Sequence, residues 1–193
     1  DLWWAKSGIL PTIDHVNLFL TWGEVEGIVC SGIDKGKKTT YALLDERVPP
    51  TRELCREEAL ARLASRYFQS HSPAQLQDFV WWSGLTATEC RLAINLIKAE
   101  LMTETFDSRE YFIHQSWKGK NESEPVLRLL PAFDEYLISY KNRTDVLPLE
   151  HHPKAFNRFG TFYPVILYNG KIIGNWGRSV KKNSIQIEMD FFE

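Results

Sequence analysis

The sequence predicts an α+β protein in which tandem winged helix-turn-helix units are followed by a small C-terminal antiparallel β-barrel or sheet. Three observations support this fold class. Residues 52–115 contain three helical patterns followed by two strand patterns, which is the order of a complete winged helix. Residues 12–45 repeat the second half of that order. The last third of the chain has strand patterns and turn signals without a long helical pattern.

The first block is predicted to be a partial winged helix over residues 1–50. Apolar side chains in 12–26 have helical spacing, and Asp14 can cap the start of this helix. The stretches GIVCSG (27–32) and TTYALLD (39–45) are predicted strands, and the basic link IDKGKK joins them.

The second block, residues 51–118, is predicted to be a complete winged helix that begins after the break at Pro49-Pro50. Thr86 is a plausible N-cap of its third helix, and Glu89 completes a capping box. Gly84 is expected to end the second helix. The predicted helices and strands of this block are 53–70, 73–82, 87–100, 101–106 and 110–114.

The third block, residues 125–193, is predicted to be a β-barrel-like domain. Asn169-Gly170 lies between two apolar stretches and predicts a hairpin turn. EYLISY (135–140) is expected to be a strand, and SIQIEMDFF (184–192) alternates so that one of its faces meets water.

Composition excludes some classes of protein. With 193 residues and 44% hydrophobic side chains, the chain can bury substantial cores. It has no apolar run of the roughly 18–20 residues that a membrane helix needs, and its start lacks the features of a signal peptide. Three cysteines without CxxC spacing indicate reduced thiols. We therefore expect a cytoplasmic protein with no membrane association.

Four stretches resemble the signature segments of the bacterial winged-helix family typified by the AlkZ-type DNA glycosylases. They occur in the expected order along the chain: YALLDERVPP, SRYFQSHSPAQLQDFVWWSGL, LLPAFDEYLISYKNR and GKIIGNW. The resemblance implies three tandem winged helices and a C-terminal β-barrel arranged around DNA. It also implies hydrolysis of the N-glycosidic bond of alkylated or cross-linked bases.

The resemblance also implies that this chain is the C-terminal portion of a longer protein. The family's catalytic motif, Gln-x-Gln or Gln-x-Asp, lies in an N-terminal region that we expect to be missing, so residues 1–50 would belong to the second of three winged helices. No catalytic residue can be assigned on this basis. We expect the isolated chain to be inactive, while the full-length protein is a candidate glycosylase.

The net charge of −2 leaves only local basic clusters to attract a polyanion. Because a glycosylase must find lesions in any sequence, its contacts are expected mainly with backbone phosphates of double-stranded DNA. Lysines donate to phosphate oxygens, and Arg and Asn at the recognition-helix position can bind base edges. The alternatives to DNA contact are that the lysines are ordinary solvated side chains and that the helix has only a packing role. The candidate contacts are Lys35, Lys37, Lys38, Thr39, Arg91, Asn95, Lys98, Arg158, Arg178, Lys181 and Lys182.

Other residues have structural and functional interpretations that the sequence leaves open. Trp81-Trp82 could stack on bases, but at least one of the pair is expected in a core. Asp134 next to Glu135 is expected to cap backbone or to pair with Lys141 or Arg143, with a role in orienting a water as the functional alternative.

We expect no cofactor and no metal, because the adjacent His151 and His152 lack further ligands at suitable spacing. We also expect a monomer, because there is no dimerisation heptad. Two other functions remain as alternatives: a winged-helix protein-interaction module, or a transcriptional regulator without enzymatic activity.

Overall fold

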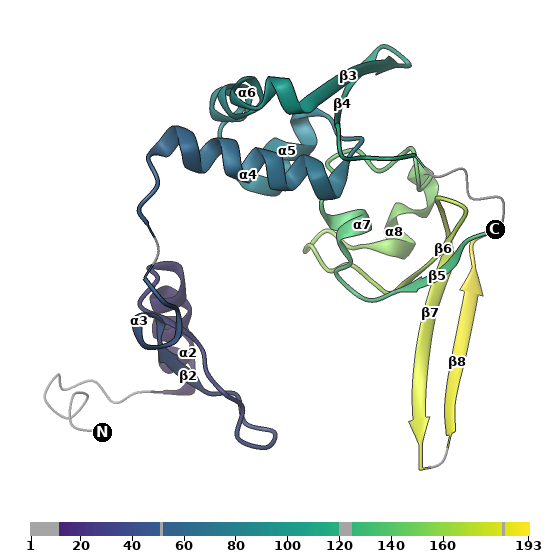
Figure 1. Ribbon diagram of the computed structural model, residues 1–193. Helices are drawn as coiled ribbons and strands as arrows, with labels where there is room; N and C mark the ends of the chain where they lie inside the picture. The colour runs from purple at the N-terminus through teal and green to yellow at the C-terminus, as the bar shows by residue number, and fades with distance from the viewer. Residues whose placement is uncertain (1–11, 51, 120–124, 183) are drawn as a thin grey trace, which may run out of the picture. The chain divides into compact units, whose positions relative to one another are not determined.

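The computed structural model describes residues 12–50, 52–119, 125–182 and 184–193 (Figure 1). The chain separates into two compact units, Asp1–Glu53 and Leu54–Glu193. The fold is mixed α/β, with two two-stranded antiparallel sheets and one four-stranded antiparallel sheet. Within the described ranges, no helix is long and apolar enough to cross a membrane.

The first unit contains one long helix and a hairpin. Helix α2 (Ile13–Val25) matches the predicted helix, but its cap is Thr12, whose hydroxyl accepts the amide of His15 at 3.3 Å. The prediction of Asp14 as the cap is therefore wrong, since Asp14 already lies in the first helical turn. Strand β1 (Val29–Ser31) pairs with β2 (Tyr41–Leu43), and the short helix α3 (Leu44–Arg47) replaces the predicted end of the second strand.

Three helices open the second unit: α4 (Arg56–His71), α5 (Leu76–Ser83) and α6 (Ala87–Leu96). The predicted capping box is confirmed, because the Thr86 hydroxyl accepts the Glu89 amide and the Glu89 carboxylate accepts the Thr86 amide. Gly84 ends α5 with a φ of 69°, as predicted. These caps fix both ends of the loop that leads into α6.

Three helix boundaries differ from the prediction. Helix α4 starts at Arg56 instead of residue 53. Helix α5 starts at Leu76 instead of residue 73, because Ala74 exchanges two backbone hydrogen bonds with Phe112 and so extends the chain there. Helix α6 ends at Leu96, and a 3-10 turn over Lys98–Glu100 follows it. Strands β3 (Leu101–Phe106) and β4 (Arg109–His114) then form the predicted hairpin.

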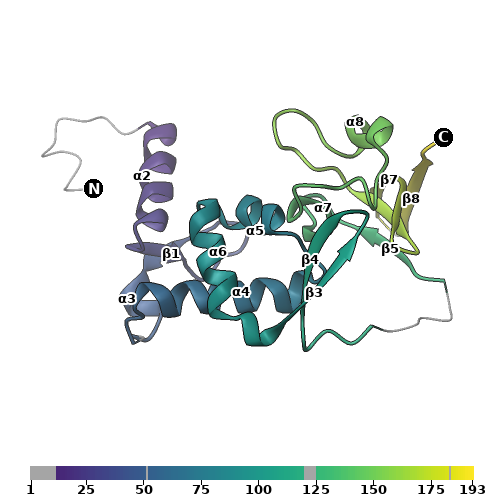
Figure 2. The same cartoon turned by 90° about the horizontal axis from the view of Figure 1, so that it is seen from above.

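The three helices surround a core of buried side chains, against which Phe112 of β4 packs. Tyr67, Phe68 and Phe79 supply the largest of these side chains, and their ring centroids lie 5.0–5.6 Å apart. Burying three aromatic rings contributes several kcal/mol of stability. The helices and the hairpin therefore form one packed layer (Figure 2).

The C-terminal part is built on a four-stranded sheet. Its strands are β5 (Leu127–Leu130), β6 (Val165–Tyr168), β7 (Lys171–Lys181) and β8 (Ser184–Phe191), in the order β5-β6-β7-β8. Strands β5 and β8 are its edges, so the sheet is open and not a closed barrel. Asn169 and Gly170 form the predicted turn, with φ values of 45° and 79°.

Two predictions for this part are wrong. Residues predicted as the strand EYLISY contain helix α7 (Glu135–Ile138), because the Asp134 side chain caps the amide of Tyr136 at 2.9 Å. The β8 strand exposes both faces, with Ile185 65% and Ile187 48% exposed. Figure 1 shows the reason: β7 and β8 project from the rest of the unit as a long ribbon.

A second core lies between the sheet and the segments that connect its strands. Helix α7, the 3-10 turn Leu149–His151 and helix α8 (His152–Ala155) fall in these segments. The buried members of this core are Leu137, Leu147, Ala155, Phe162, Val165 and Ile172. Leu137 is the point at which α7 is anchored to the sheet.

Candidate nucleic-acid interface

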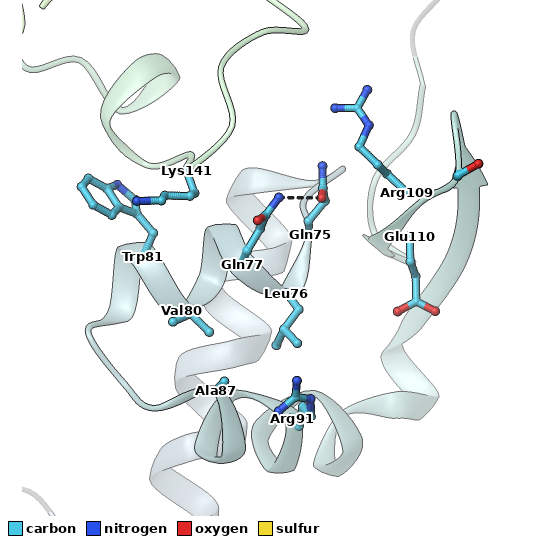
Figure 3. Close-up of a pocket in the computed structure, with 11 residues that line it drawn as sticks. Gln75, Leu76, Gln77, Val80, Trp81, Ala87, Arg91, Arg109, Glu110 and Lys141 are labelled. Carbon is cyan, nitrogen blue, oxygen red and sulfur yellow. Dashed lines mark hydrogen bonds between the residues drawn. The ribbon is translucent and has the colours of Figure 1, made fainter.

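A groove runs along α6 in the second unit. Its wider part has a volume of about 650 Å³ and lies between α5, α6 and the start of β4 (Figure 3). An adjoining part of about 450 Å³ continues between α6 and the β3–β4 hairpin. Leu76, Arg91 and Glu110 line both parts, so we describe them together as the α6 groove.

Three predicted DNA-contact residues lie together in this groove. Arg91, Asn95 and Lys98 follow one another at helical spacing, and all three are exposed. Side chains four and then three residues apart project from one face of a helix. Within the described ranges, neither Arg91 nor Lys98 has an acidic partner within ion-pair distance. Their positive charges are therefore available to an anionic ligand, although the contact itself stays a prediction.

Two further cations at this groove were not selected from the sequence. Arg109 and Lys141 line its wider part, and Figure 3 shows both above the floor formed by α6. Arg109 is held by Asp145, with N–O distances of 2.8 and 3.1 Å. This hydrogen-bonded guanidinium lowers the pKa of the Asp145 carboxyl. No sequence signal places residues 109 and 141 beside residue 91, because only the tertiary fold brings them together.

Trp81 is an aromatic side chain that lines the wider part of the groove. Its indole N–H donates to the carbonyl of Ile138 at 2.8 Å, which fixes the orientation of the ring. The ammonium group of Lys141 lies over the ring, 4.6 Å from its centre. The backbone amide of Lys141 is itself held by the buried carboxylate of Asp78 at 2.8 Å. Ring and cation therefore form an ordered pair.

The two adjacent tryptophans have different surroundings. Trp81 is 46% exposed at the groove, whereas Trp82 is 36% exposed and packs on Tyr67 and His71. A helical step of about 100° separates the two side chains. Both tryptophans are exposed, so the expectation that at least one of them lies in a core is wrong. Trp81 is the member of the pair that lines the groove.

The stretch Gln75-Leu76-Gln77 has the spacing of a Gln-x-Gln motif but is used as a helix start. Gln75 is the N-cap residue of α5, and its side-chain oxygen accepts the side-chain N–H of Gln77 at 2.9 Å. The neighbouring Asp78 carboxylate accepts the backbone amides of Gln75, Lys141 and Asn142. These hydrogen bonds give the stretch a structural role.

The predicted lysines of the first unit lie at the end of the β1–β2 hairpin. Lys35 and Lys38 exchange two backbone hydrogen bonds of 3.0 and 3.2 Å, which leaves Gly36 and Lys37 at the turn. Gly36 has a φ of 66°, a conformation that glycine adopts without strain. Lys35, Lys37, Lys38 and Thr39 are all exposed. The tight turn therefore keeps the backbone positions of the three lysines close together.

The remaining predicted residues are exposed but are not gathered into the α6 groove. Arg158 lies over the ring of Phe159 at 4.8 Å. Arg178 is on β7, and Lys181 and Lys182 are at the end of the β7–β8 ribbon. Lys181 donates to the amide oxygen of Gln186 at 3.4 Å. These four residues form separate local positive charges.

Asp134 and Glu135 have structural partners. Asp134 caps α7, as one interpretation of the sequence predicted, and the alternative of a pair with Lys141 or Arg143 is not what the structure shows. Glu135 accepts the hydroxyl of Ser139 and lies 3.4 Å from the Nε2 atom of His71. Arg143 instead donates to the carbonyl of Leu137 and lies over the rings of Phe156 and Phe162.

The histidines that were considered as metal ligands also have other partners. His151 lies 3.7 Å from Glu150, and His152 contacts the carbonyl of Leu147 at 3.1 Å. Among the residues whose positions the structure gives, no three His, Cys, Asp or Glu side chains gather where they could hold a metal ion.

Comparison with known proteins places the chain in a family. The sequence model of the AlkZ-like DNA glycosylases matches residues 16–193. The chain belongs to the AlkZ-like DNA glycosylase family. This assignment agrees with the resemblance of the four sequence stretches and connects the chain to DNA repair.

A curated protein and a solved structure, both from Streptomyces sahachiroi, are similar to this AlkZ-like chain. The interstrand DNA cross-link repair glycosylase is 25% identical over 170 residues, which are 80% of this chain and 46% of the relative. The solved structure of the DNA glycosylase AlkZ superposes with a TM-score of 0.70 and 21% identity, over 90% of this chain and 50% of AlkZ. The chain spans about half the length of the relatives that it matches, and the superposition shows that the fold is shared.

Proposed function

We propose that this chain binds double-stranded DNA, mainly through backbone phosphates, as part of a base-excision DNA glycosylase that acts on alkylated or cross-linked bases. Family membership and the name of the cross-link repair relative support this proposal. We also propose that residues 1–50 and 51–118 are winged helices, followed by a C-terminal domain over 125–193. The helix–hairpin order α4, α5, α6, β3, β4 supports the second of these.

The observation that carries the proposal is a row of three exposed side chains at the α6 groove: Arg91 and Asn95 on α6, and Lys98 in the 3-10 turn that follows it. Among the residues that line this groove, the acidic Glu110 is outnumbered by Arg91, Lys98 and Lys141. Phosphate binding depends on such local cations, because releasing counterions from DNA supplies most of its non-specific affinity. An amide and a guanidinium add hydrogen-bond donors for phosphates or base edges.

The hairpin lysines are proposed as a second phosphate contact. A turn that exposes Lys35, Lys37 and Lys38 suits the backbone of a duplex, because ammonium groups act on phosphates as point charges. Thr39, Arg158, Arg178, Lys181 and Lys182 are proposed as further contacts of the same kind. N-glycosidic hydrolysis is proposed for the protein as a whole, and no residue of this chain is assigned to it.

Charge reversal in the α6 groove tests the proposal. We expect the Arg91→Glu/Lys98→Glu variant to bind a 20-base-pair duplex at least tenfold more weakly in a fluorescence anisotropy titration at low salt. Arg66→Glu, an exposed change on α4 outside the groove, is the matched control and should alter affinity much less. If the groove variant and Arg66→Glu weaken binding equally, the groove is not the DNA site.

A protein-interaction module is the second candidate function, and the β7–β8 ribbon favours it. Val180 and Ile185 are paired across the ribbon and are 71% and 65% exposed, and Ile187 and Met189 continue the same face of β8. Exposed apolar faces of this kind occur at protein–protein contacts. Under this alternative, changing Lys35, Lys37 and Lys38 to Glu leaves partner binding intact, whereas under the DNA proposal the change weakens duplex binding.

A further inference from the structure

We infer that the wider part of the α6 groove accepts an unpaired nucleotide of a DNA strand, with its base against Trp81. This inference rests on the proposed DNA binding and adds a preference for DNA in which one base lies outside the stack. Trp81, Leu76, Val80 and Ala87 would contact the base, and Arg91 and Lys141 would contact its phosphates.

The size and lining of the cavity suit a nucleotide, which has an apolar base face and an anionic phosphate. Leu76, Val80 and Ala87 supply an apolar floor, and Figure 3 shows Arg91 and Lys141 on opposite sides of it. A volume of about 650 Å³ falls within the range of small-molecule sites. A flat base with an attached phosphate has an apolar face and an anionic end, which this lining complements.

The tryptophan is held in a fixed orientation beside two cations, with Lys141 at 4.6 Å and Arg143 at 5.6 Å from its ring centre, so a stacked base would take the place of one of these contacts. The hydrogen bond from its indole N–H to Ile138 orients the ring, yet 46% of the residue is exposed. An aromatic ring that is held in place loses little conformational freedom when a base packs on it. Aromatic rings with nearby cations are the usual contact surface for unpaired bases, because every base has a π-face.

The charges around the cavity favour a base over an isolated phosphate. Arg109 is neutralised by Asp145, and Glu110 opposes the positive charges of Arg91 and Lys141. Arg91 and Lys141 still exceed Glu110, so a positive charge remains for the phosphate, and stacking and apolar contact would add the preference for a base. In fully paired DNA the base faces are covered by their neighbours, so only an extruded or unpaired base can use these contacts.

Gln77 can add a polar contact to the edge of the base. Its amide nitrogen donates to Gln75 at 2.9 Å, which leaves its amide oxygen without a donor among the residues that the structure describes. An acceptor at this point suits an exocyclic amino group or ring N–H of a base. The cavity therefore offers a stacking surface, a base-edge acceptor and cations.

The test compares two fluorescein-labelled 20-base-pair duplexes that differ only by one central bulged nucleotide. Fluorescence anisotropy titrations at constant salt use the whole 193-residue chain. We expect the bulged duplex to bind more tightly than the fully paired duplex. Trp81→Ala should weaken binding of the bulged duplex by roughly 5- to 150-fold, the effect of losing one base–aromatic stack. Binding of the paired duplex should change by less than about twofold.

Two further variants separate stacking from loss of structure. Trp117→Ala removes an equally exposed tryptophan, 47% against 46%, and should leave both affinities unchanged. Ala87→Leu keeps Trp81 and its hydrogen bond but fills the floor of the cavity with a good helix former. It should also remove the preference for the bulged duplex. Thermal unfolding of each variant shows whether the fold is retained.

The outcomes distinguish this inference from the proposed function. If the paired duplex binds in a salt-dependent way and the bulge brings no gain, DNA binding stands and the nucleotide site is wrong. If neither duplex binds, both are wrong. Free deoxyadenosine monophosphate can also be added as a competitor of the labelled bulged duplex. If it displaces that duplex at the same molar concentration as unlabelled bulged duplex does, the ligand is a free nucleotide and the assignment to DNA fails.

Discussion

The Asp78 carboxylate links the helices of the second unit to the segment that follows α7. The residue is 2% exposed, and its two oxygens accept the amides of Gln75, Lys141 and Asn142 at 2.8–3.3 Å. Hydrogen bonds to a buried charged group are stronger than those between neutral groups. Asp78 therefore helps to hold Lys141 beside Trp81.

Replacing Asp78 tests this role. We expect Asp78→Ala to lower the free energy of unfolding by about 2–4 kcal/mol, because it leaves buried backbone donors without an acceptor. Urea denaturation measures the change. Glu57→Ala, an exposed change in the first turn of α4, serves as the control and should stay within about 0.5 kcal/mol of the parent. A similar small effect of Asp78→Ala would show that the carboxylate contributes little.

Tyr140 makes the stability of the second unit depend on alkaline pH. Burial raises the pKa of Tyr140 to about 12, and its hydroxyl donates to the carbonyl of His71 at 3.0 Å. This pKa is higher in the folded than in the unfolded chain. The contribution of Tyr140 to the free energy of unfolding is therefore complete below about pH 10 and is lost as pH rises through about 12.

The expected result is a fall in the free energy of unfolding between about pH 10 and pH 12 that is smaller in Tyr140→Phe than in the parent. Denaturant unfolding at a series of pH values gives both curves. Burial also raises the pKa of Tyr67, so part of the fall should remain in the variant. Parallel curves for the two proteins would contradict the assignment to Tyr140.

At the scale of elements, local signals decided which predictions were correct. The capping box of Thr86 and Glu89 fixed the start of α6, and Asn169-Gly170 fixed the β6–β7 turn. Both signals depend on hydrogen bonds or backbone conformations within a few residues. Such elements can be predicted because the interactions that form them are adjacent in the sequence.

The EYLISY stretch shows where sequence patterns were insufficient. Its apolar residues fit a short strand or a single turn of helix equally well. The cap from Asp134 and the burial of Leu137, 2% exposed, selected the helix. The second of these factors is a tertiary contact, so periodicity alone could not identify it. The open sheet and the exposed β7–β8 ribbon likewise depend on what packs against the strands.

The turn between β6 and β7 gives a stability prediction with an internal control. Gly170 has a φ of 79°, so Gly170→Ala places a side chain in a strained conformation and should cost about 1 kcal/mol. Gly177→Ala, on β7, should be close to neutral, since its φ is not positive and no atom lies within 4 Å of the added carbon. Thermal melts compare the two variants. Equal destabilisation would show that backbone strain is not the cause.

At the scale of the whole molecule, the candidate site combines segments that are distant in sequence. Arg91 and Lys98 were predicted from the face of a single helix, whereas Arg109, Lys141 and Trp81 join them only because α5, β4 and the segment after α7 meet there. The chain belongs to the AlkZ-like DNA glycosylase family, and the role of the groove is our proposal. The central claim is that its free cations bind DNA phosphates.

The dependence of duplex affinity on salt tests that claim most directly. For the 193-residue chain, the logarithm of the association constant should fall linearly with the logarithm of salt concentration. Arg91→Ala/Lys98→Ala removes two cations, so its slope should be shallower by about 1.8, at about 0.9 for each phosphate contact. An affinity that does not change with salt, or an equal slope in the double variant, would contradict the account.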